Sequence, residues 1–340
     1  MTTALERIRT AKRELGQDVV ILAHHYQRKE VVEQGDFVGD SYQLAKYAAA
    51  SNARRIVFCG VHFMAEAARI LARPEQRVFM PDPRAGCPMA DMADARDSVV
   101  ALTRLREMAG EKRRIIPVTY VNSNADVKAV VGHAGGLVCT SANAPKALQW
   151  AASKGDLLFF LPDEFLGTNT ANGLGYLPVA RWNPHEADGG LTTDKVRAAR
   201  VIVWQGYCHV HTYFTPAMVA AARLKYPGCS VVVHPECKPD VVAVADGLGS
   251  TSYLVDAVEK TAPGQTVVVG TEVNLVLRLA NQYPDRKVVP LEYSLCPNMY
   301  RTTPEKLADL LENFDPAREI TVPEDVVAGA RLALQRMLDL

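Results

Sequence analysis

The stretch GYCHVH, residues 206–211, places one cysteine and two histidines within four positions, and both residue types bind transition metals. The neighbouring sequence has no second C-x-x-C pair and no histidine pair at the spacing of a zinc finger. If Cys208 binds a metal, its co-ligands must come from distant parts of the chain. Cys87 and Cys296 are candidates, because each also follows a strand-like apolar segment.

The three cysteines close three copies of one order of features: a buried strand, a polar cluster, a hydroxyl residue opening a helix, and two more strands. The polar clusters are His24-His25-Tyr26, Tyr120-Val121-Asn122 and His234-Pro235-Glu236, and the hydroxyl residues are Ser41, Ser141 and Thr251. Cluster and cysteine are 63 residues apart in the first copy (His24 to Cys87) and 62 in the third (His234 to Cys296). The middle copy spans 88 residues, and the excess fits a loop-like insertion at about 167–190.

The elements that must position these residues indicate an α/β protein. Nine short, β-branched segments such as RIVFCG and TVVVGTE alternate with alanine-rich helical stretches. We therefore predict three similar α/β/α sandwich domains with small parallel sheets, related by a pseudo-threefold axis around a central active site. Their bounds are residues 1–87 with the C-terminal segment 297–340 packing onto them, 88–208 with the insertion, and 209–296. Parallel strands carry functional groups at their C-terminal ends, so the three cysteines should converge there.

Composition excludes several classes of partner. The 340 residues carry 38 Lys+Arg and 38 Asp+Glu without a basic block, so neither nucleic acid nor an anionic membrane is an expected partner. No apolar run approaches the roughly 18 residues of a membrane span, and the N-terminus reads as an amphipathic helix without a signal core. We expect a cytoplasmic protein, in which the seven cysteines do not form disulfides.

Three converging thiolates leave three functions open. A [4Fe–4S] cluster on three cysteines keeps one iron open to substrate as a Lewis acid. A zinc-dependent lyase or aldolase would use the same thiolates with His209 or His211. A third possibility is a non-catalytic cluster-binding sensor. Among the other cysteines, Cys59 and Cys139 read as core and Cys229 as inert, whereas Cys237 lies close enough to Glu236 to stay open.

A series of motifs resembles the A-type quinolinate synthase family, in the family's order and over nearly the whole chain. They are AHHYQ (23–27), GDS (39–41), CPMADM (87–92), YVN (120–122), TSAN (140–143), LPDEFLGTNTA (161–171), W-x-G-x-C-x-V-H (204–211), HPE (234–236), GST (249–251) and the late Cys296. Some members carry C-x-x-C-x-x-C at the last position, but here it reads CPNMYRT, with Cys296 alone.

The resemblance implies three α/β domains around one [4Fe–4S] cluster per chain, held by Cys87, Cys208 and Cys296. The implied reaction condenses iminosuccinate with dihydroxyacetone phosphate to quinolinate, phosphate and two waters, in de novo NAD biosynthesis. A functional link to the L-aspartate oxidase that supplies iminosuccinate follows from it.

The polar residues have a structural interpretation beside the functional one. Ser41, Ser141 and Thr251 would cap helices or hold anions at helix N-termini, and a lone histidine such as His24 is often structural. The resemblance favours ligand contact. The implied substrate-binding residues are His24, Ser41, Tyr120, Val121, Asn122, Ser141, His234, Pro235, Glu236 and Thr251. The implied catalytic residues are Glu236 as general base, Tyr26 as its acid/base partner, Tyr120, and His211 beside the cluster. His25 reads as structural and His209 stays open.

Overall fold

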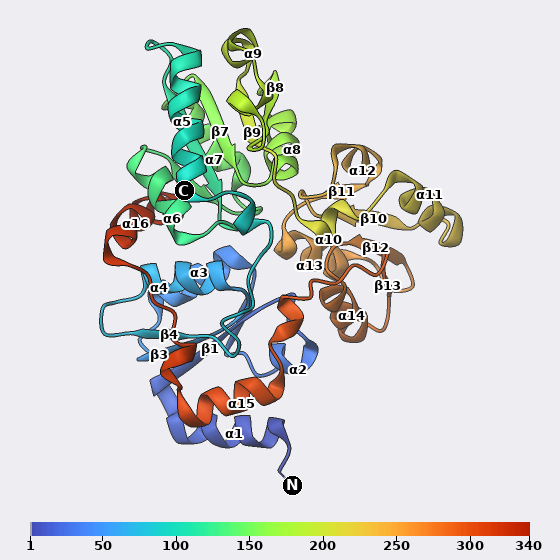
Figure 1. The fold of residues 1–340 in the computed structure, drawn as a ribbon. Coiled ribbons are helices and arrows are strands. Elements are labelled where there is room, and N and C mark those ends of the chain that lie inside the picture. Colours follow the sequence, from blue (N-terminus) through green and yellow to red (C-terminus); the bar gives the residue numbers. More distant parts are fainter. Residues whose placement is uncertain (1) are drawn as a thin grey trace.

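The computed structural model describes residues 2–340 and contains three small sheets of parallel strands, each flanked by helices (Figure 1). The predicted α/β fold class is confirmed. The first sheet has the order β2-β1-β3-β4, with β1 (Val19–His24), β2 (Phe37–Gly39), β3 (Arg55–Cys59) and β4 (Arg77–Phe79). The second has the order β6-β5-β7-β9-β8, with β5 (Ile115–Tyr120), β6 (Leu137–Cys139), β7 (Leu157–Leu161), β8 (Val179–Trp182) and β9 (Val201–Trp204). The third has the order β11-β10-β12-β13, with β10 (Ser230–Val233), β11 (Gly247–Leu248), β12 (Thr266–Gly270) and β13 (Lys287–Pro290).

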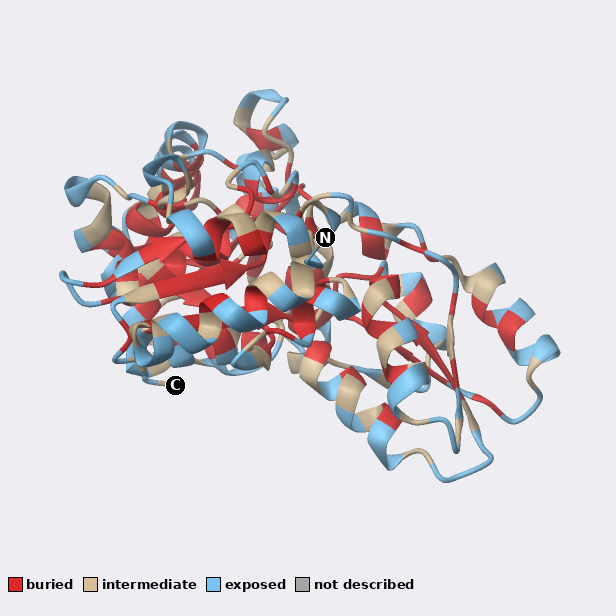
Figure 2. Ribbon diagram, turned by 90° about the horizontal axis from the view of Figure 1, so that it is seen from below, coloured by how far each residue is buried: buried red, intermediate tan, exposed pale blue. Residues whose placement is uncertain are grey.

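Helices connect these strands and cover the faces of the sheets, and Figure 2 shows buried strands between helices whose outer faces are exposed. The helices of the first and second units are α1 (Ala4–Leu15), α2 (Lys29–Val32), α3 (Ser41–Ala50), α4 (His62–Leu71), α5 (Ala95–Ala109), α6 (Ala125–His133), α7 (Ala144–Ala152), α8 (Glu164–Leu174) and α9 (Thr193–Ala198). Those that follow are α10 (His209–Thr212), α11 (Pro216–Lys225), α12 (Pro239–Val244), α13 (Thr251–Lys260), α14 (Val273–Gln282), α15 (Pro304–Asn313) and α16 (Glu324–Leu338). Short 3₁₀ turns occupy Gly16–Asp18, Ala90–Met92, Ala187–Gly190, Met299–Arg301 and Pro316–Arg318. Within residues 2–340, no helix combines the length and apolar character needed to cross a bilayer.

Strand register places the three polar clusters at equivalent positions. In the first sheet, the last residue of β1 that pairs with β3 is Ala23, opposite Cys59. The equivalent pairings are β5 with β7 and β10 with β12. In the second sheet the last such residue is Thr119, opposite Leu161, and in the third it is Val233, opposite Gly270. One residue further along the chain from each of these stand His24, Tyr120 and His234, the first members of the clusters. The repeat proposed from spacing alone is therefore present in the backbone.

The insertion of the middle copy is folded, which corrects the loop-like interpretation. Asp163 caps α8 by accepting the backbone N–H of Leu166 at 2.6 Å, and the helix ends at Gly175 with a positive φ of 69°. Gly167 inside this helix has a packing reason, since a Cβ there would lie 2.7 Å from the Phe160 ring. Residues 179–182 then form β8, which adds a fifth strand beside β9. Two of the glycines that suggested a loop therefore belong to a helix: Gly167 allows close packing and Gly175 ends the helix.

The C-terminal segment divides between two units, which corrects the expectation that all of 297–340 packs onto the first. Helix α15 lies against α1 of the first unit, but α16 packs mainly on α6 and β6 of the second (Figure 1). Gly132 of α6 and Gly329 of α16 allow a backbone-to-backbone approach, because a Cβ on Gly132 would lie 1.9 Å from the Gly329 carbonyl oxygen. The segment therefore joins the first two units.

The hydrophobic core is continuous across the first two units but not into the third. Side chains from both sheets and from α16 form one buried cluster. The third unit has two clusters of its own, one on each face of its sheet. It contacts the other two units through polar residues at the strand ends, such as Tyr26 with Thr271, and through packing of α12 on α8.

Candidate active site

One cavity lies where the C-terminal ends of the three sheets meet. Its lining includes predicted residues from all three units: His24, Tyr26, Ser41, Cys87, Tyr120, Asn122, Ser141, Cys208, His211, His234, Glu236, Thr251 and Cys296. Val121 and Pro235 do not line it. The N–H of Val121 bonds to the Cys139 carbonyl at 2.7 Å, and the Pro235 carbonyl accepts from the Asn169 amide at 2.9 Å.

The three cysteine loops are tethered in the same way. In each unit, the backbone N–H three residues past the end of β3, β7 or β12 donates to the carbonyl two residues before the cysteine. The pairs are His62 to Ala85 (2.8 Å), Glu164 to Gly206 (2.8 Å) and Val273 to Ser294 (2.9 Å). Because the tether has the same register in every unit, Cys87, Cys208 and Cys296 reach the cavity from equivalent places.

Each of these cysteines also begins a helical turn whose backbone N–H groups point at its sulfur. The donors are Met89 and Ala90 for Cys87, His211 for Cys208, and Asn298 and Met299 for Cys296. Such N–H groups stabilise a thiolate. All seven cysteines are free, and the other four are buried.

Electrostatics at the three thiols favours a bound cation. Burial raises the pKa of Cys87 to about 12, and it also raises the pKa of Cys208 and of Cys296. Each of the three is raised further by negative charge nearby, which includes the neighbouring thiols for Cys87 and Cys208. Three soft donors with N–H support fit a metal group that takes three thiolates. A mixed set is also within reach, since ligand atoms of Cys208, His211 and Glu236 lie within 4.8 Å of one another.

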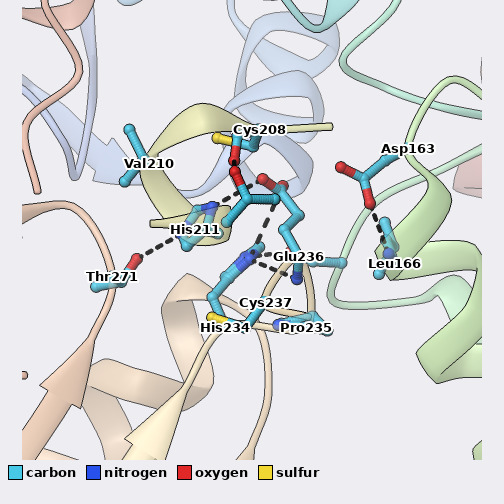
Figure 3. A network of polar contacts seen from close by, with 12 residues as sticks. Asp163, Leu166, Cys208, Val210, His211, His234, Pro235, Glu236, Cys237 and Thr271 are labelled. Atoms are coloured by element: carbon cyan, nitrogen blue, oxygen red, sulfur yellow. Dashed lines mark hydrogen bonds and ion pairs between the residues drawn. The ribbon is translucent and has the colours of Figure 1, made fainter. Parts of the chain in front are cut away.

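Glu236 is the centre of a buried polar network, drawn in Figure 3. Its Oε1 accepts from the Tyr120 hydroxyl at 2.5 Å and its Oε2 bonds to Nδ1 of His211 at 2.8 Å. Burial alone would raise the pKa of Glu236, but the adjacent His211 and the hydrogen bond from Tyr120 outweigh it and lower the pKa. Burial and this carboxylate raise the pKa of Tyr120. At neutral pH, Glu236 is therefore ionised and Tyr120 protonated.

His234 stacks on the His211 ring, with the ring centroids 4.4 Å apart, and its Nε2 lies 3.2 Å from the Ser141 hydroxyl. Burial and His211 lower the pKa of His234 to about 3, so the ring is neutral. It can offer one donor and one acceptor to its surroundings.

Tyr26 extends from the first unit into the third. Its hydroxyl lies 2.7 Å from Thr271 Oγ1 and accepts from the Thr251 hydroxyl at 3.1 Å. The Tyr26 ring meets that of His24 edge-on at 4.7 Å. Burial raises the pKa of Tyr26 and lowers that of His24, so both side chains are neutral at neutral pH.

The cavity hydroxyls do not cap their helices. Asp40 caps α3 and Ser250 caps α13, so Ser41 and Thr251 are the first helical residues with their hydroxyls free of that task. Ser141 was expected to open a helix. It lies instead in the turn before α7, because the Asn143 side chain folds back onto Thr140 N–H at 2.7 Å and delays the helix to Ala144.

Comparisons with known proteins decide the family. The family model described as "Quinolinate synthetase A protein" matches residues 6–339. The chain is 46% identical to "Quinolinate synthase" of Acidobacterium capsulatum over 98% of this chain and 92% of that one. It is 47% identical to that of Corynebacterium glutamicum (98% and 86%) and 44% identical to that of Halobacterium salinarum (100% and 92%). The chain belongs to the quinolinate synthetase A family. The family predicted from its motifs, and with it an enzyme, is confirmed.

Reasoning from the sequence missed three buried polar residues of this family member: Asp163, Thr271 and Glu272. Asp163 lies two residues beyond the end of β7, and Thr271 lies one residue beyond the end of β12. Glu272 caps α14, and its Oε1 accepts the backbone N–H of Cys296 at 3.3 Å. The repeat could have indicated Asp163 and Thr271, because it predicts a strand that ends just before each of them. Polar residues were sought only after the first strand of each copy, which is β1, β5 or β10.

Residues left open by the sequence lie away from the cavity. His209 is exposed on α10, next to Cys208 in sequence. Cys237 is buried behind the HPE turn, where its carbonyl accepts from Asn169 at 2.8 Å. His25 lies 2.9 Å from the Arg278 guanidinium, a contact between the first and third units that fits a structural role.

Proposed function

We propose that this protein is a quinolinate synthase of de novo NAD biosynthesis. It condenses iminosuccinate with dihydroxyacetone phosphate to quinolinate, phosphate and two waters. Membership of the family supports the proposal. The observation that carries it is the meeting of three thiols and an acid–base network, each drawn from different units, on one cavity.

Cys87, Cys208 and Cys296 would hold one [4Fe–4S] cluster per chain. Their equivalent tethers and sulfur-directed N–H groups support this assignment. When bound, such a cluster supplies an open iron that acts as a Lewis acid in the removal of a hydroxyl group.

The substrates are anions, and the described residues that line the cavity include no arginine or lysine. Carboxylate and phosphate groups would therefore be bound by the hydroxyls of Ser41, Ser141 and Thr251. Ser41 and Thr251 have the added advantage of standing at helix N-termini, where backbone N–H groups favour negative charge. Asn122 Oδ1 is buried without a hydrogen-bond partner among residues 2–340, so the amide is available to a ligand.

Proton transfers fall to the buried network. Glu236 is ionised and removes protons, while Tyr120 is protonated and hydrogen-bonded to it. His211 is held on Glu236 and lies beside Cys208. Tyr26 provides the second phenol, with its ring centroid 6.4 Å from that of His211.

Three assignments accompany this function. The repeats are domains with bounds at residues 1–87, 88–208 and 209–296, as their spacing predicts. The protein acts in the cytoplasm, and it depends on an L-aspartate oxidase for iminosuccinate, because that substrate must be produced by oxidation of aspartate.

Anaerobic purification tests the function. The protein should absorb broadly near ~400 nm, as sulfur-to-iron charge transfer predicts, and contain iron and sulfide. It should form quinolinate from the two substrates. A colourless protein with stoichiometric zinc would support the second candidate, a zinc lyase, which the Cys208–His211–Glu236 set favours. A coloured protein that forms no quinolinate would support a cluster-binding sensor.

A further inference from the structure

Thr271 connects two parts of the active site that belong to different units. It follows β12, its side chain is fully buried, and it does not line the cavity. Its Oγ1 lies 2.7 Å from the Tyr26 hydroxyl and 3.0 Å from Nε2 of His211. Figure 3 shows the second of these contacts, with His211 between Thr271 and Glu236.

The hydroxyl of Thr271 links the two sides of the site. An ionised carboxylate only accepts, so His211 donates from Nδ1 to Glu236. The other ring nitrogen, Nε2, lies 3.0 Å from the Thr271 hydroxyl. A hydroxyl has one proton and two lone pairs, so Thr271 can bond to His211 and to Tyr26 at the same time. A continuous chain of hydrogen bonds therefore connects Tyr26 to Glu236 through Thr271 and His211.

We propose that Thr271 is a positioning residue for the reaction, whose hydroxyl orients the Tyr26 phenol and the His211 ring. The proposal rests on the proposed function, because it assumes that these two residues and Glu236 serve catalysis.

The hydroxyl has no other structural task that explains its place. Glu272, not Thr271, caps α14. Without the hydroxyl, His211 Nε2 and the Tyr26 phenol would both lose a partner inside a buried site. A purely structural threonine would instead contribute through its methyl group and its shape, which valine retains.

The test compares Thr271→Val with Thr271→Ser in anaerobically prepared protein of equal iron and sulfide content. The valine variant should lose about 10- to 100-fold in kcat, as expected for a residue that orients active-site ligands, with KM for both substrates nearly unchanged. The serine variant should stay within a few-fold of the wild type. Thr271→Val should add little to Tyr26→Phe, since the two residues act through one chain.

Three results would overturn the assignment: an unchanged kcat in the valine variant, an equal loss in the serine variant, or full additivity with Tyr26→Phe. If the valine variant lacks a cooperative melting transition, Thr271→Ala takes its place under the same criteria. A wild-type protein that forms no quinolinate would refute the proposed function. An active wild type with an active valine variant refutes only the role of Thr271.

Discussion

Replacing Glu236 by glutamine should abolish most turnover while leaving the cysteines untouched. The carboxylate accepts from Tyr120 at 2.5 Å through one oxygen and from His211 at 2.8 Å through the other. An amide offers one acceptor and one donor group, so one of these donors must lose its partner. A hydrogen bond to a charged group contributes about 1.5–3 kcal/mol, and the loss of a general base costs roughly 10²–10⁴ in rate. The rate loss corresponds to about 3–5 kcal/mol of activation free energy.

The assay is quinolinate formation at saturating substrates, beside iron and sulfide content and a melting curve. Glu164→Gln is a matched control: this carboxylate is also largely buried and near the strand ends, but it pairs with Arg181 at 2.9 Å and does not line the cavity. It should keep near-normal kcat. Near-normal turnover in Glu236→Gln with a full cluster would make Glu236 structural and refute the reasoning.

Glu236 also predicts a pH dependence of stability. Its folded-state pKa lies below the ordinary value of 4.5, so its contribution to the unfolding free energy is present above that pH and is lost as the pH falls through the folded pKa. Melting temperatures of wild type and Glu236→Gln should therefore converge as the pH falls below about 4.5. A constant difference between pH 7 and pH 3 would contradict the lowered pKa.

Three further variant sets test the remaining assignments. Serine at a proposed ligand position (Cys87, Cys208 or Cys296) should strip the cluster and abolish quinolinate formation, because a hydroxyl is a harder and far less acidic ligand than a thiol. Serine at a core position (Cys59, Cys139 or Cys229) should keep full iron content. Full iron in Cys296→Ser, or its loss in Cys139→Ser, would refute the threefold ligand set. Ser41→Ala and Thr251→Ala should raise KM with little change in melting temperature, because Asp40 and Ser250 cap helices α3 and α13. A fall of about 1 kcal/mol in the free energy of unfolding with an unchanged KM would instead indicate that the two hydroxyls cap the helices. Asp163→Ala should lose about 1 kcal/mol of stability through the cap of α8, and Asp163→Asn should keep it, as measured by denaturant unfolding.

The sequence predicted the sheets well because most strands are fully buried. All nine apolar segments contain a strand, since a parallel strand covered on both faces leaves a continuous hydrophobic run. Strands β2, β6, β8 and β11 lie outside these nine segments. Each lies at the edge of its sheet and is bonded to one neighbour only; β2 and β6 have three residues each and β11 has two. The backbone of such a strand is held by hydrogen bonds to its one neighbour, so its residues need no recognisable hydrophobic pattern.

The sequence could predict the site residues whose positions follow from the repeat. It could not predict the residues whose place in the site depends on contacts between units. The cysteines and polar clusters follow strand ends, so counting along the repeat finds them. Thr271 gains its role only because Tyr26 of another unit reaches it at 2.7 Å. The packing of α16 on α6 could not be predicted from the sequence repeat either, because it depends on the close backbone approach at Gly132 and Gly329.

Chemical asymmetry arises here from side chains on a symmetric backbone. The register places Tyr26, Asn122 and Glu236 at equivalent points, two residues after His24, Tyr120 and His234. A strict threefold repeat would give three identical groups, which could bind a symmetric metal group but could not separate an acid from a base. The three cysteines are the same in every unit, as the proposed cluster requires, because each position would supply the same soft ligand. The neighbouring positions carry a phenol, an amide and a carboxylate, and the pKa values of Tyr26 and Glu236 are shifted in opposite directions in one buried site. In the proposed enzyme, the identical positions would therefore bind the metal group, and the positions that differ between the units would carry out the acid–base chemistry.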